Sequence, residues 1–516
     1  MAKNKSMAFR TSINLICGVG VLVVNTLVSF FLSPYIIRAI GVEANGFVNL
    51  ANNFVYYANL VVIALNAMAA RFITISYVNE DYKKANMYYN SVFWGNLIID
   101  AVLLLPVAFF IGRIEYVINV PENLVWDVRI LFGVILLSFF VRTGAPNYDC
   151  GTYVTNRMDL SYIPSMATAL LRCVMLFGMF SLLAPHVWYV GFTSMIISFI
   201  TLGVAGHFTH KLTPELKVVF KKPICSGKAI KELVGSGIWS AFAIAGSTMM
   251  NGLDLIVCNL ALGVTEMGVL SVSKSIPAIM TEFTETLRGA FGPELTLAYA
   301  QGHKETVLST IRRSMKITAV VVSIPTAGII VMSDALYMLW QPTLDAHLLQ
   351  ILTILAVLDP LVCNGVSVLN NVFVTANKVK YNAYASLITG FASIGITLLF
   401  VNFTDYGLYA VAGVSSVMMI IKNLTFMLPI TAHFLGFKWY QFYPNVLTSI
   451  ICSGLNVFVG LLVRHFLPVN GWVTFFLACM IIAFIGLCIN MMIVLNKGER
   501  AYLMKIIKRK SHERDQ

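Results

Sequence analysis

Charged residues are scarce in this chain of 516 residues. They make up 12% of the sequence, whereas 58% of the residues are hydrophobic, and a soluble protein normally carries about 25% charged residues. This composition excludes a water-soluble protein and predicts a membrane protein. Basic residues outnumber acidic ones, 36 to 24. In so apolar a chain, that excess indicates orientation in the membrane and contact with anionic lipid rather than nucleic-acid binding.

The motifs of common catalytic sites are also missing. No Gly-x-x-x-x-Gly-Lys-Ser/Thr loop occurs, so the sequence predicts no ATP hydrolysis by this chain. There is no His-Glu-x-x-His motif and no Cys-x-x-Cys pair, and the nine cysteines are scattered through apolar stretches. We therefore expect no metal and no cofactor, and a transporter rather than an enzyme.

Long apolar stretches are what the sequence does contain. Each is long enough to cross a bilayer, and together they predict an all-α polytopic membrane protein with about 14 transmembrane helices. The first follows a basic N-terminus and continues without a cleavage site, so we expect a retained span. The predicted spans are residues 12–37, 45–69, 91–112, 128–154, 161–183, 188–208, 235–260, 268–291, 314–333, 347–375, 382–401, 407–430, 445–466 and 472–495.

The distribution of basic residues orients these spans. Most of the 36 lysines and arginines lie in the loops that this topology assigns to the cytoplasm, and only Arg38, Arg113, Arg129 and Arg464 lie in the loops assigned outside or at the span ends next to them. This asymmetry predicts that both termini are cytoplasmic. The outside loops are short, so we expect no external catalytic domain.

An internal repeat divides the chain. Ala39-Ile40-Gly41-Val42, followed by Gly46, recurs 222 residues later as Ala261-Leu262-Gly263-Val264, followed by Gly268. Each copy covers six spans, an even number, so the halves are predicted to lie parallel and to work by alternating access about a shared cavity. The predicted organisation is an N-terminal lobe (1–210), a basic cytoplasmic linker (211–234), a C-terminal lobe (235–430), spans thirteen and fourteen (431–496), and a basic cytoplasmic tail (497–516).

Two motifs of the repeat resemble a known family. Ser33-Pro34-Tyr35-Ile36-Ile37-Arg38-Ala39-Ile40-Gly41, running on to Gly46, resembles the first outer turn of the Wzx-type oligosaccharide flippases. Asp254-Leu255-Ile256 with Gly263 and Gly268 is similar to the Asp, Gly, Gly spacing of that family, although Leu270 stands where the family usually has a tyrosine. The resemblance covers most of the chain and implies the multidrug/oligosaccharidyl-lipid/polysaccharide (MOP) exporter superfamily.

The resemblance also implies a function. Such a flippase moves undecaprenyl-pyrophosphate-linked oligosaccharide across the bacterial inner membrane for the assembly of O-antigen, capsule or exopolysaccharide. A polysaccharide polymerase and glycosyltransferases are the implied protein partners.

Ionisable residues inside the predicted spans are the candidate site. Such residues are costly in a membrane and usually face a bundle interior or a water-filled cavity, where cations would hold a pyrophosphate. Instead of binding a ligand, Arg288 could form an ion pair with Glu285, and Arg142 could form one with Asp149. The cations are Arg142, Arg172, Lys274, Arg288 and Lys422.

Amides and acids complete the candidate site. Asn45, Asn52, Asn59 and Asn66 recur every seven residues along one face of the second span. Amides donate and accept hydrogen bonds, which suits sugar hydroxyls, but they also join neighbouring spans. The acids that could carry a coupling proton or sodium ion, or instead pair with a buried cation, are Asp254, Glu285 and Asp359.

Two other classes of protein remain as alternatives. A cation-coupled multidrug exporter of the same superfamily usually has fewer spans and an acidic, aromatic cavity, whereas the embedded cations favour an anionic lipid. A membrane-embedded polysaccharide polymerase or acyltransferase requires a large external loop or an intramembrane histidine. The predicted outside loops are short, and the eight histidines lie in loops or at the ends of predicted spans.

Overall fold

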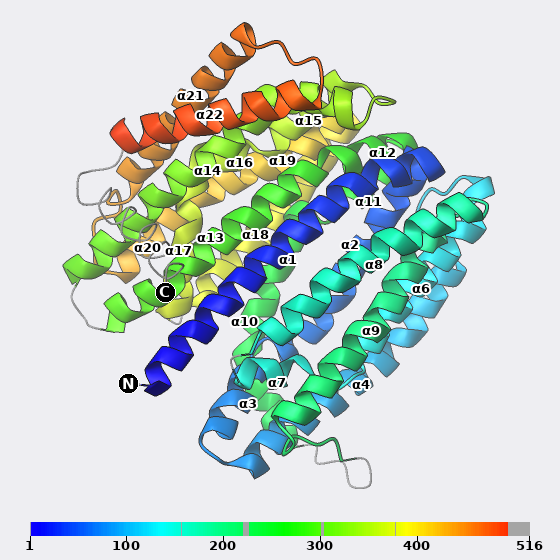
Figure 1. Cartoon of the computed structure of the whole chain (residues 1–516), viewed down its shortest axis with the longest axis vertical. Coiled ribbons are helices and arrows are strands. Elements are labelled where there is room, and N and C mark those ends of the chain that lie inside the picture. Colours follow the sequence, from blue (N-terminus) through cyan, green and yellow to red (C-terminus); the bar gives the residue numbers. More distant parts are fainter. Residues whose placement is uncertain (1, 156, 220–225, 301–303, 377, 494–516) are drawn as a thin grey trace. The chain divides into compact units, whose positions relative to one another are not determined.

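The computed structural model describes residues 2–155, 157–219, 226–300, 304–376 and 378–493 (Figure 1). Within these residues the chain is helical, and no β-strand is present. The predicted all-α polytopic fold is therefore confirmed. The predicted tail (497–516) and part of the predicted linker (211–234) lie outside the described residues.

The chain divides into two compact units. Unit 1 comprises Met1–Thr248 and Leu255–Gly268, and unit 2 comprises Met249–Asp254 and Val269–Gln516. The helices that begin in unit 1 or cross its boundary are α1 (Ala2–Ile40), α2 (Val42–Asn66), α3 (Ala69–Val78), α4 (Tyr82–Gly112), α5 (Ile114–Val117), α6 (Val125–Thr143), α7 (Asp149–Val154), α8 (Asp159–Leu182), α9 (Trp188–Leu212), α10 (Gly227–Asn251), α11 (Asp254–Ala261) and α12 (Val264–Ser273).

The remaining helices belong to unit 2. They are α13 (Ser275–Ala300), α14 (Lys304–Trp340), α15 (Ala346–Ala356), α16 (Leu358–Cys363), α17 (Leu369–Thr375), α18 (Val379–Phe403), α19 (Gly407–Lys422), α20 (Leu428–Phe434), α21 (Tyr443–Phe466) and α22 (Trp472–Ile493). A 3-10 helix (Asn364–Val368) separates α16 from α17, and a π-helical turn (Asn423–Met427) separates α19 from α20.

Among the described residues, 12 helical segments are long and apolar enough to cross a membrane, or 13 if one bent pair counts as a span. The sequence predicts about 14. The difference is the predicted span 268–291, which the structure builds as α12 and α13. This segment is helical, but Lys274, Glu282, Glu285 and Arg288 make it too polar to count as an apolar span.

Two predicted spans are interrupted for local reasons. The prediction 128–154 is too long, because α6 ends at Thr143 and α7 begins only at Asp149. Pro146 lies in the gap, and a proline disfavours helix in the residue before it. The prediction 347–375 is bent by 48° between Ala346–Ala356 and Leu358–Thr375. There Pro360 lacks the N–H that would continue the helical hydrogen bonds.

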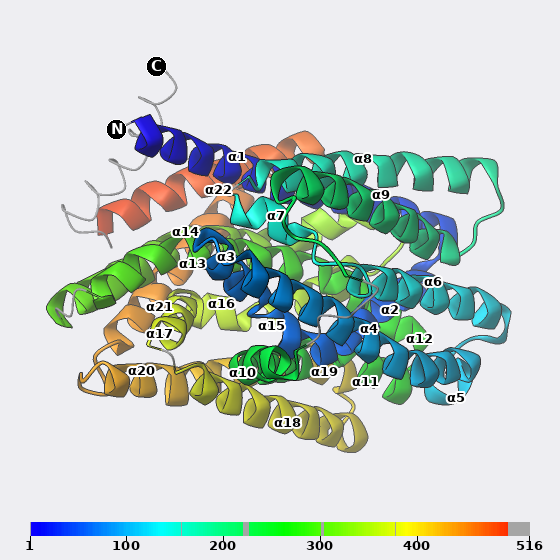
Figure 2. The ribbon, with the colours of Figure 1, turned by 90° about the horizontal axis from the view of Figure 1, so that it is seen from below.

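Unit 1 is built around long helices that pack side by side. α1 lies along α8, and α9 contacts both α6 and α8 (Figures 1 and 2). At one end, Ile73 of α3, Tyr88 and Tyr89 of α4 and Leu233 of α10 form a buried cluster. This cluster joins α10, which opens the predicted C-terminal lobe, to helices of the N-terminal half.

Unit 2 is organised around α14, which is buried to a larger extent than any other of the 12 apolar segments. Small side chains on α14 allow close helix packing, and α21 and α22 both pack against it. Asn456 of α21 and Asn490 of α22 each donate to the Ser323 Oγ of α14, at 2.8 and 3.2 Å. Spans thirteen and fourteen are therefore fixed to unit 2 by specific buried hydrogen bonds.

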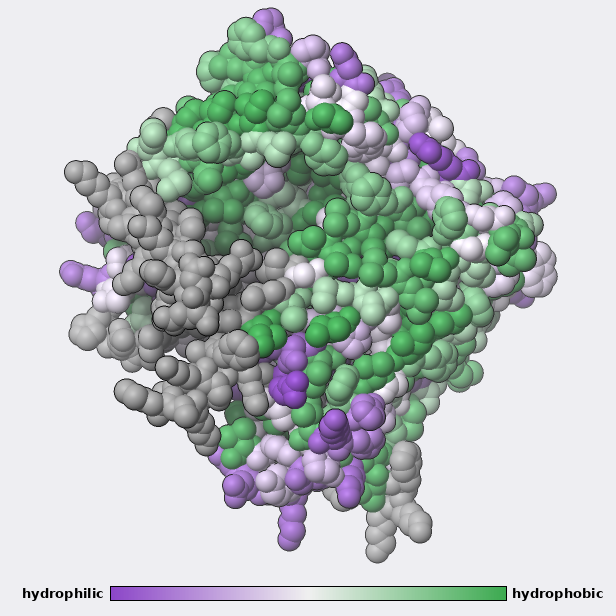
Figure 3. Space-filling model, in the orientation of Figure 1, coloured by the Kyte–Doolittle hydropathy of each residue, from purple (hydrophilic) through white to green (hydrophobic). Residues whose placement is uncertain are grey.

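Apolar side chains also cover much of the surface. In Figure 3, hydrophobic residues spread over the region of α21 and α22 at the top of the view, as expected for helices that face lipid. Large exposed side chains on these two helices include Leu447, Phe458, Phe466, Val473, Met480 and Phe484.

Candidate functional site

In both copies of the repeat motif, a glycine with a positive φ lies between two helices. Gly41 lies between α1 and α2 with φ of 86°, and Gly263 lies between α11 and α12 with φ of 132°. Both angles are in the left-handed range, which glycine adopts without strain. The residue pair that is equivalent in the sequence is thus equivalent in local structure.

Near these turns, α11 and α12 contact the N-terminal helices within unit 1. A Cβ added at Gly46 would lie 3.0 Å from the Gly268 Cα, so the two backbones meet where neither has a side chain. Thr265 donates to the Glu43 carboxylate at 2.7 Å. Asn119 and Asn259 are joined by three hydrogen bonds of 2.8–3.0 Å. We call these contacts the outer contact, because the predicted topology places them outside.

In unit 2, two of the predicted cations have carboxylate partners. Lys274, between α12 and α13, forms an ion pair with Asp254 at the start of α11. Arg288 forms an ion pair with Glu285, three residues earlier on α13. The sequence analysis gave this ion pair of Arg288 as the alternative to contact with a ligand. The sequence left open that Asp254 pairs with a buried cation, and the structure shows that this cation is Lys274, 20 residues later in the chain.

A second polar cluster in unit 2 surrounds Lys422 at the end of α19. Asn423 donates to the Asp359 carboxylate of α16 at 2.8 Å. The Lys422 ammonium lies 3.5 Å from the Ser386 hydroxyl of α18, and no described carboxylate lies within ion-pair distance of it. We call Lys422, Ser386, Asp359 and Asn423 the Lys422 cluster. It lies where the bent span and the π-helical turn meet, and such irregular turns are frequent at functional sites.

In unit 1, Arg172 of α8 lies on a helical face with little to neutralise it. Its Nε atom is buried and has no hydrogen-bond partner, and Arg172 forms no ion pair with a described residue. The hydroxyls of Ser165 and Thr168, seven and four residues before Arg172 on α8, bond to carbonyls of their own helix. An unneutralised arginine in a membrane helix is unfavourable without solvent or a ligand.

Arg142 does not form the ion pair with Asp149 that their spacing in the sequence suggested. The pairing with Asp149 assumed one continuous helix, but α6 ends at Thr143 and Asp149 begins α7. Arg142 is exposed and has no ion-pair partner among the described residues. The pairing with Asp149 is therefore wrong, because the break in the helix removes the shared face.

The asparagine stripe of α2 does not form one uniform surface. Asn45 is buried, whereas Asn52 and Asn59 are exposed. Asn52 donates to the Val48 carbonyl of its own helix at 3.0 Å. Asn66 exchanges two hydrogen bonds of 3.0 and 3.1 Å with Asn96 of α4, so it joins two helices.

Sequence reasoning missed an acid on the same helix as Asn96. Asp100 follows four residues later on α4, is 7% exposed, and accepts a hydrogen bond of 2.8 Å from the Thr143 hydroxyl. It forms no ion pair with a described residue. The signal was present in the sequence, since Asp100 is an isolated carboxylate inside the predicted span 91–112.

Comparison with known proteins places the fold. No protein-family model matches this chain. It is 23% identical over 508 residues to an uncharacterized membrane protein, EpsK of Bacillus subtilis, covering 96% of this chain and 97% of EpsK.

Two solved structures are similar to this chain in overall fold. A multidrug resistance MATE family transporter of the MOP superfamily, in an inward-facing conformation, aligns with a TM-score of 0.62 at 14% identity, covering 83% of this chain and 98% of its own. The lipid II flippase MurJ aligns with a TM-score of 0.62 at 15% identity, covering 92% and 97%. The chain has the fold of MOP-superfamily transporters.

Within this MOP fold, the predicted cations separate into two groups. Lys274 and Arg288 are paired with carboxylates. Arg142, Arg172 and Lys422 form no ion pair with a described residue. The second group is the better candidate for contact with an anion, because no described carboxylate lies within ion-pair distance of these three cations.

Proposed function

We propose that this chain is a Wzx-type flippase that moves undecaprenyl-pyrophosphate-linked oligosaccharide across the bacterial inner membrane by alternating access. Its product would enter O-antigen, capsule or exopolysaccharide assembly, with glycosyltransferases supplying the lipid-linked sugar and a polymerase consuming it. Both termini would lie in the cytoplasm, as the basic residues predict.

The observation that carries this proposal is the presence of cations without carboxylate partners inside membrane helices. Arg172 in unit 1 and Lys422 in unit 2 are half-buried, and neither forms an ion pair with a described residue. Charges that only stabilise a fold are usually neutralised within it. A pyrophosphate offers several negative charges to such groups, and arginine binds phosphate in a bidentate manner.

The alignments with solved structures are consistent with a lipid substrate. The alignment with the lipid II flippase covers 92% of this chain, whereas that with the multidrug transporter covers 83%. The sequence motifs around Gly46 and Gly268 add the resemblance to oligosaccharide flippases.

A cation-coupled multidrug exporter is the second candidate. It is favoured by Asp100 and Asp359, which lie at membrane depth and form no ion pair with a described residue. Such acids could bind an organic cation. They serve equally to carry a coupling proton or sodium ion in a flippase, and in that role Asp100 joins Asp254, Glu285 and Asp359.

Reconstitution into proteoliposomes distinguishes the two candidates. The full chain would be assayed with a fluorescent undecaprenyl-pyrophosphate-linked oligosaccharide, scoring its protection from a membrane-impermeant quencher, and in parallel with ethidium as an organic cation. We expect movement of the lipid-linked sugar, strongly reduced in Arg172→Met. Arg113→Met, which removes an exposed outer-loop arginine, is the matched control. Ethidium transport without movement of the lipid would overturn the proposal.

A further inference from the structure

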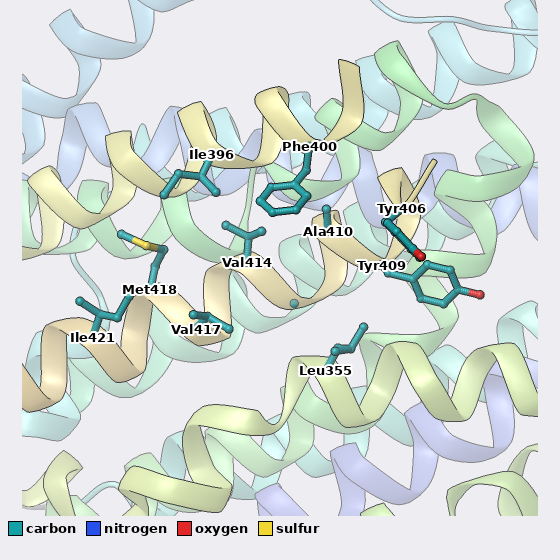
Figure 4. A pocket seen from close by; sticks show the side chains of 11 residues that line it. Leu355, Ile396, Phe400, Tyr406, Tyr409, Ala410, Val414, Val417, Met418 and Ile421 are labelled. Atoms are coloured by element: carbon teal, nitrogen blue, oxygen red, sulfur yellow. The ribbon is translucent and has the colours of Figure 1, made fainter. Parts of the chain in front are cut away.

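An apolar groove runs along α19 in unit 2. Its lining comes from α15, α18 and α19 and encloses about 430 Å³. In Figure 4, Ile396 and Phe400 of α18 form one side, Leu355 of α15 forms the other, and α19 lies between them. The groove is open to the surface, since Phe400 and Ile421 are 44% and 45% exposed.

The dimensions of the groove match a lipid chain. Tyr406 and Tyr409 lie at one end and Ile421 at the other (Figure 4). From Tyr406 to Ile421, α19 advances about 22 Å at 1.5 Å per residue. The hydrocarbon core of a bilayer is about 30 Å thick, so a chain in this groove would cross most of it.

The inner end of the groove lies next to Lys422 along the chain. Ile421, the last lining residue, precedes Lys422 in α19. The α18 wall leads to Ser386, beside the Lys422 ammonium, and the α15 wall leads on to α16 and Asp359. Along α19, the apolar lining thus ends one residue before a half-buried cation that has no carboxylate within ion-pair distance among the described residues.

We infer that this groove and Lys422 together form a binding site for a polyprenyl phosphate lipid. The isoprenoid chain lies along α19, and the phosphate accepts hydrogen bonds from the Lys422 ammonium. An apolar chain alone would suit any membrane lipid, but a charge at one end selects an anionic headgroup. The predicted topology puts Tyr406 outside and Lys422 toward the cytoplasm, so the lipid would enter from the cytoplasmic leaflet.

This inference rests on the proposed function and makes it more specific. It places the lipid carrier on unit 2 alone, on α18 and α19, without requiring the sugar. The binding site can therefore be tested with a sugar-free lipid, separately from transport.

The test uses the full chain in phosphatidylcholine liposomes with a photoreactive polyprenyl phosphate that carries a diazirine on its terminal isoprene. Ile396→Trp fills the groove, whereas Leu399→Trp, on the same helix but outside the lining, is the matched control. We expect labelling to fall about tenfold in Ile396→Trp and to stay unchanged in Leu399→Trp. Equal labelling of both variants would overturn the inference.

The headgroup is tested with charge variants. Lys422→Met should lower labelling about tenfold, Lys422→Arg should preserve it, and Asp359→Asn should raise it by removing a nearby negative charge. A polyprenol without phosphate should label weakly. Competition by phosphatidylglycerol as strong as that by unlabelled polyprenyl phosphate would show a general lipid groove and overturn the inference.

The outcomes separate this inference from the proposed function. A wild-type protein that moves the lipid-linked oligosaccharide but shows no labelling in the groove would contradict only the binding site. A protein that neither moves the lipid-linked sugar nor labels with polyprenyl phosphate would contradict both.

Discussion

The two units differ in where their ion pairs lie. In unit 2, ion pairs join or stabilise membrane helices: Lys274 with Asp254, Arg288 with Glu285, Arg313 with Glu294, and Arg464 with Asp334. In the described part of unit 1, ion pairs lie at helix ends and loops, namely Arg129 with Glu115 and Arg157 with Asp159, and His186 forms a hydrogen bond with Asp127. Among the charges of unit 1 inside predicted spans, Arg142, Arg172 and Asp100 form no ion pair with a described residue.

This difference separates structural from functional charge. A buried ion pair can stabilise a fold only while both partners are present. A single charge in a membrane helix has no comparable structural use and marks a pathway for solvent, ion or substrate. We therefore expect substitutions of charge in unit 2 to affect mainly stability, with the Lys422 cluster as an exception, and those in unit 1 to affect mainly transport.

The largest effect is expected for Arg172→Met. Removing an unneutralised cation should cost no stability, but it removes charge-assisted hydrogen bonds to a pyrophosphate, each about 1.5–3 kcal/mol. The initial rate of lipid movement should fall at least about tenfold. Flipping in proteoliposomes and the melting temperature in detergent would be measured together. A lower melting temperature with an unchanged rate would show that Arg172 stabilises the fold and would contradict the transport role expected for charges in unit 1.

Lys274→Met should have the opposite profile. It leaves Asp254, which is 6% exposed, without its partner, and breaking such a pair costs about 3 kcal/mol. The fraction of folded protein should fall, while the rate per folded molecule falls less than in Arg172→Met. The double variant Lys274→Met with Asp254→Asn should recover most of the stability. Failure of that recovery would show that the two side chains do not act as a pair.

Asp100→Asn tests whether an acid without an ion pair differs in role from an acid that has one, such as Glu285. The amide can still accept the hydrogen bond from Thr143, so the fold should persist. If Asp100 carries the coupling proton, transport should lose its dependence on an imposed pH gradient. Glu285→Gln in unit 2 should lower stability by freeing Arg288, without this loss. A gradient response unchanged in Asp100→Asn would assign coupling elsewhere.

The smallest effects concern the asparagine stripe of α2. Asn66→Ala removes both hydrogen bonds to Asn96 and should lower stability by about 1 kcal/mol, with little change in rate. Asn59→Ala, at an exposed position, should leave stability unchanged and slow transport a few-fold if sugars contact it. Equal stability losses in the two variants would mean that the whole stripe is interhelical.

Much of the fold could be predicted from the sequence because membrane helices are encoded locally. A run of apolar residues must be helical in lipid, where every backbone group needs an internal partner. The predicted spans 161–183 and 188–208 accordingly match α8 (Asp159–Leu182) and α9 (Trp188–Leu212) within a few residues. The prediction was less accurate at Pro146 and Pro360, where a single residue interrupts a long apolar run.

The repeat was equally visible in the sequence. Gly41 and Gly263 both adopt left-handed angles because each must reverse the chain between two helices. The location of candidate cations could also be predicted, since an ionisable residue in an apolar stretch is conspicuous. Asp100 was as visible as the others and was overlooked.

The sequence alone determined the membrane-spanning helical class, the duplicated turns, and the positions of Arg172, Lys274 and Lys422 in apolar surroundings. Only the tertiary structure decided which charges are neutralised. Asp254 reaches Lys274, Asn96 reaches Asn66, and Asn423 reaches Asp359 from different helices. The physical reason is range: helix formation depends on neighbours a few residues apart, whereas the partner of a buried charge depends on helix breaks and packing that no local spacing specifies.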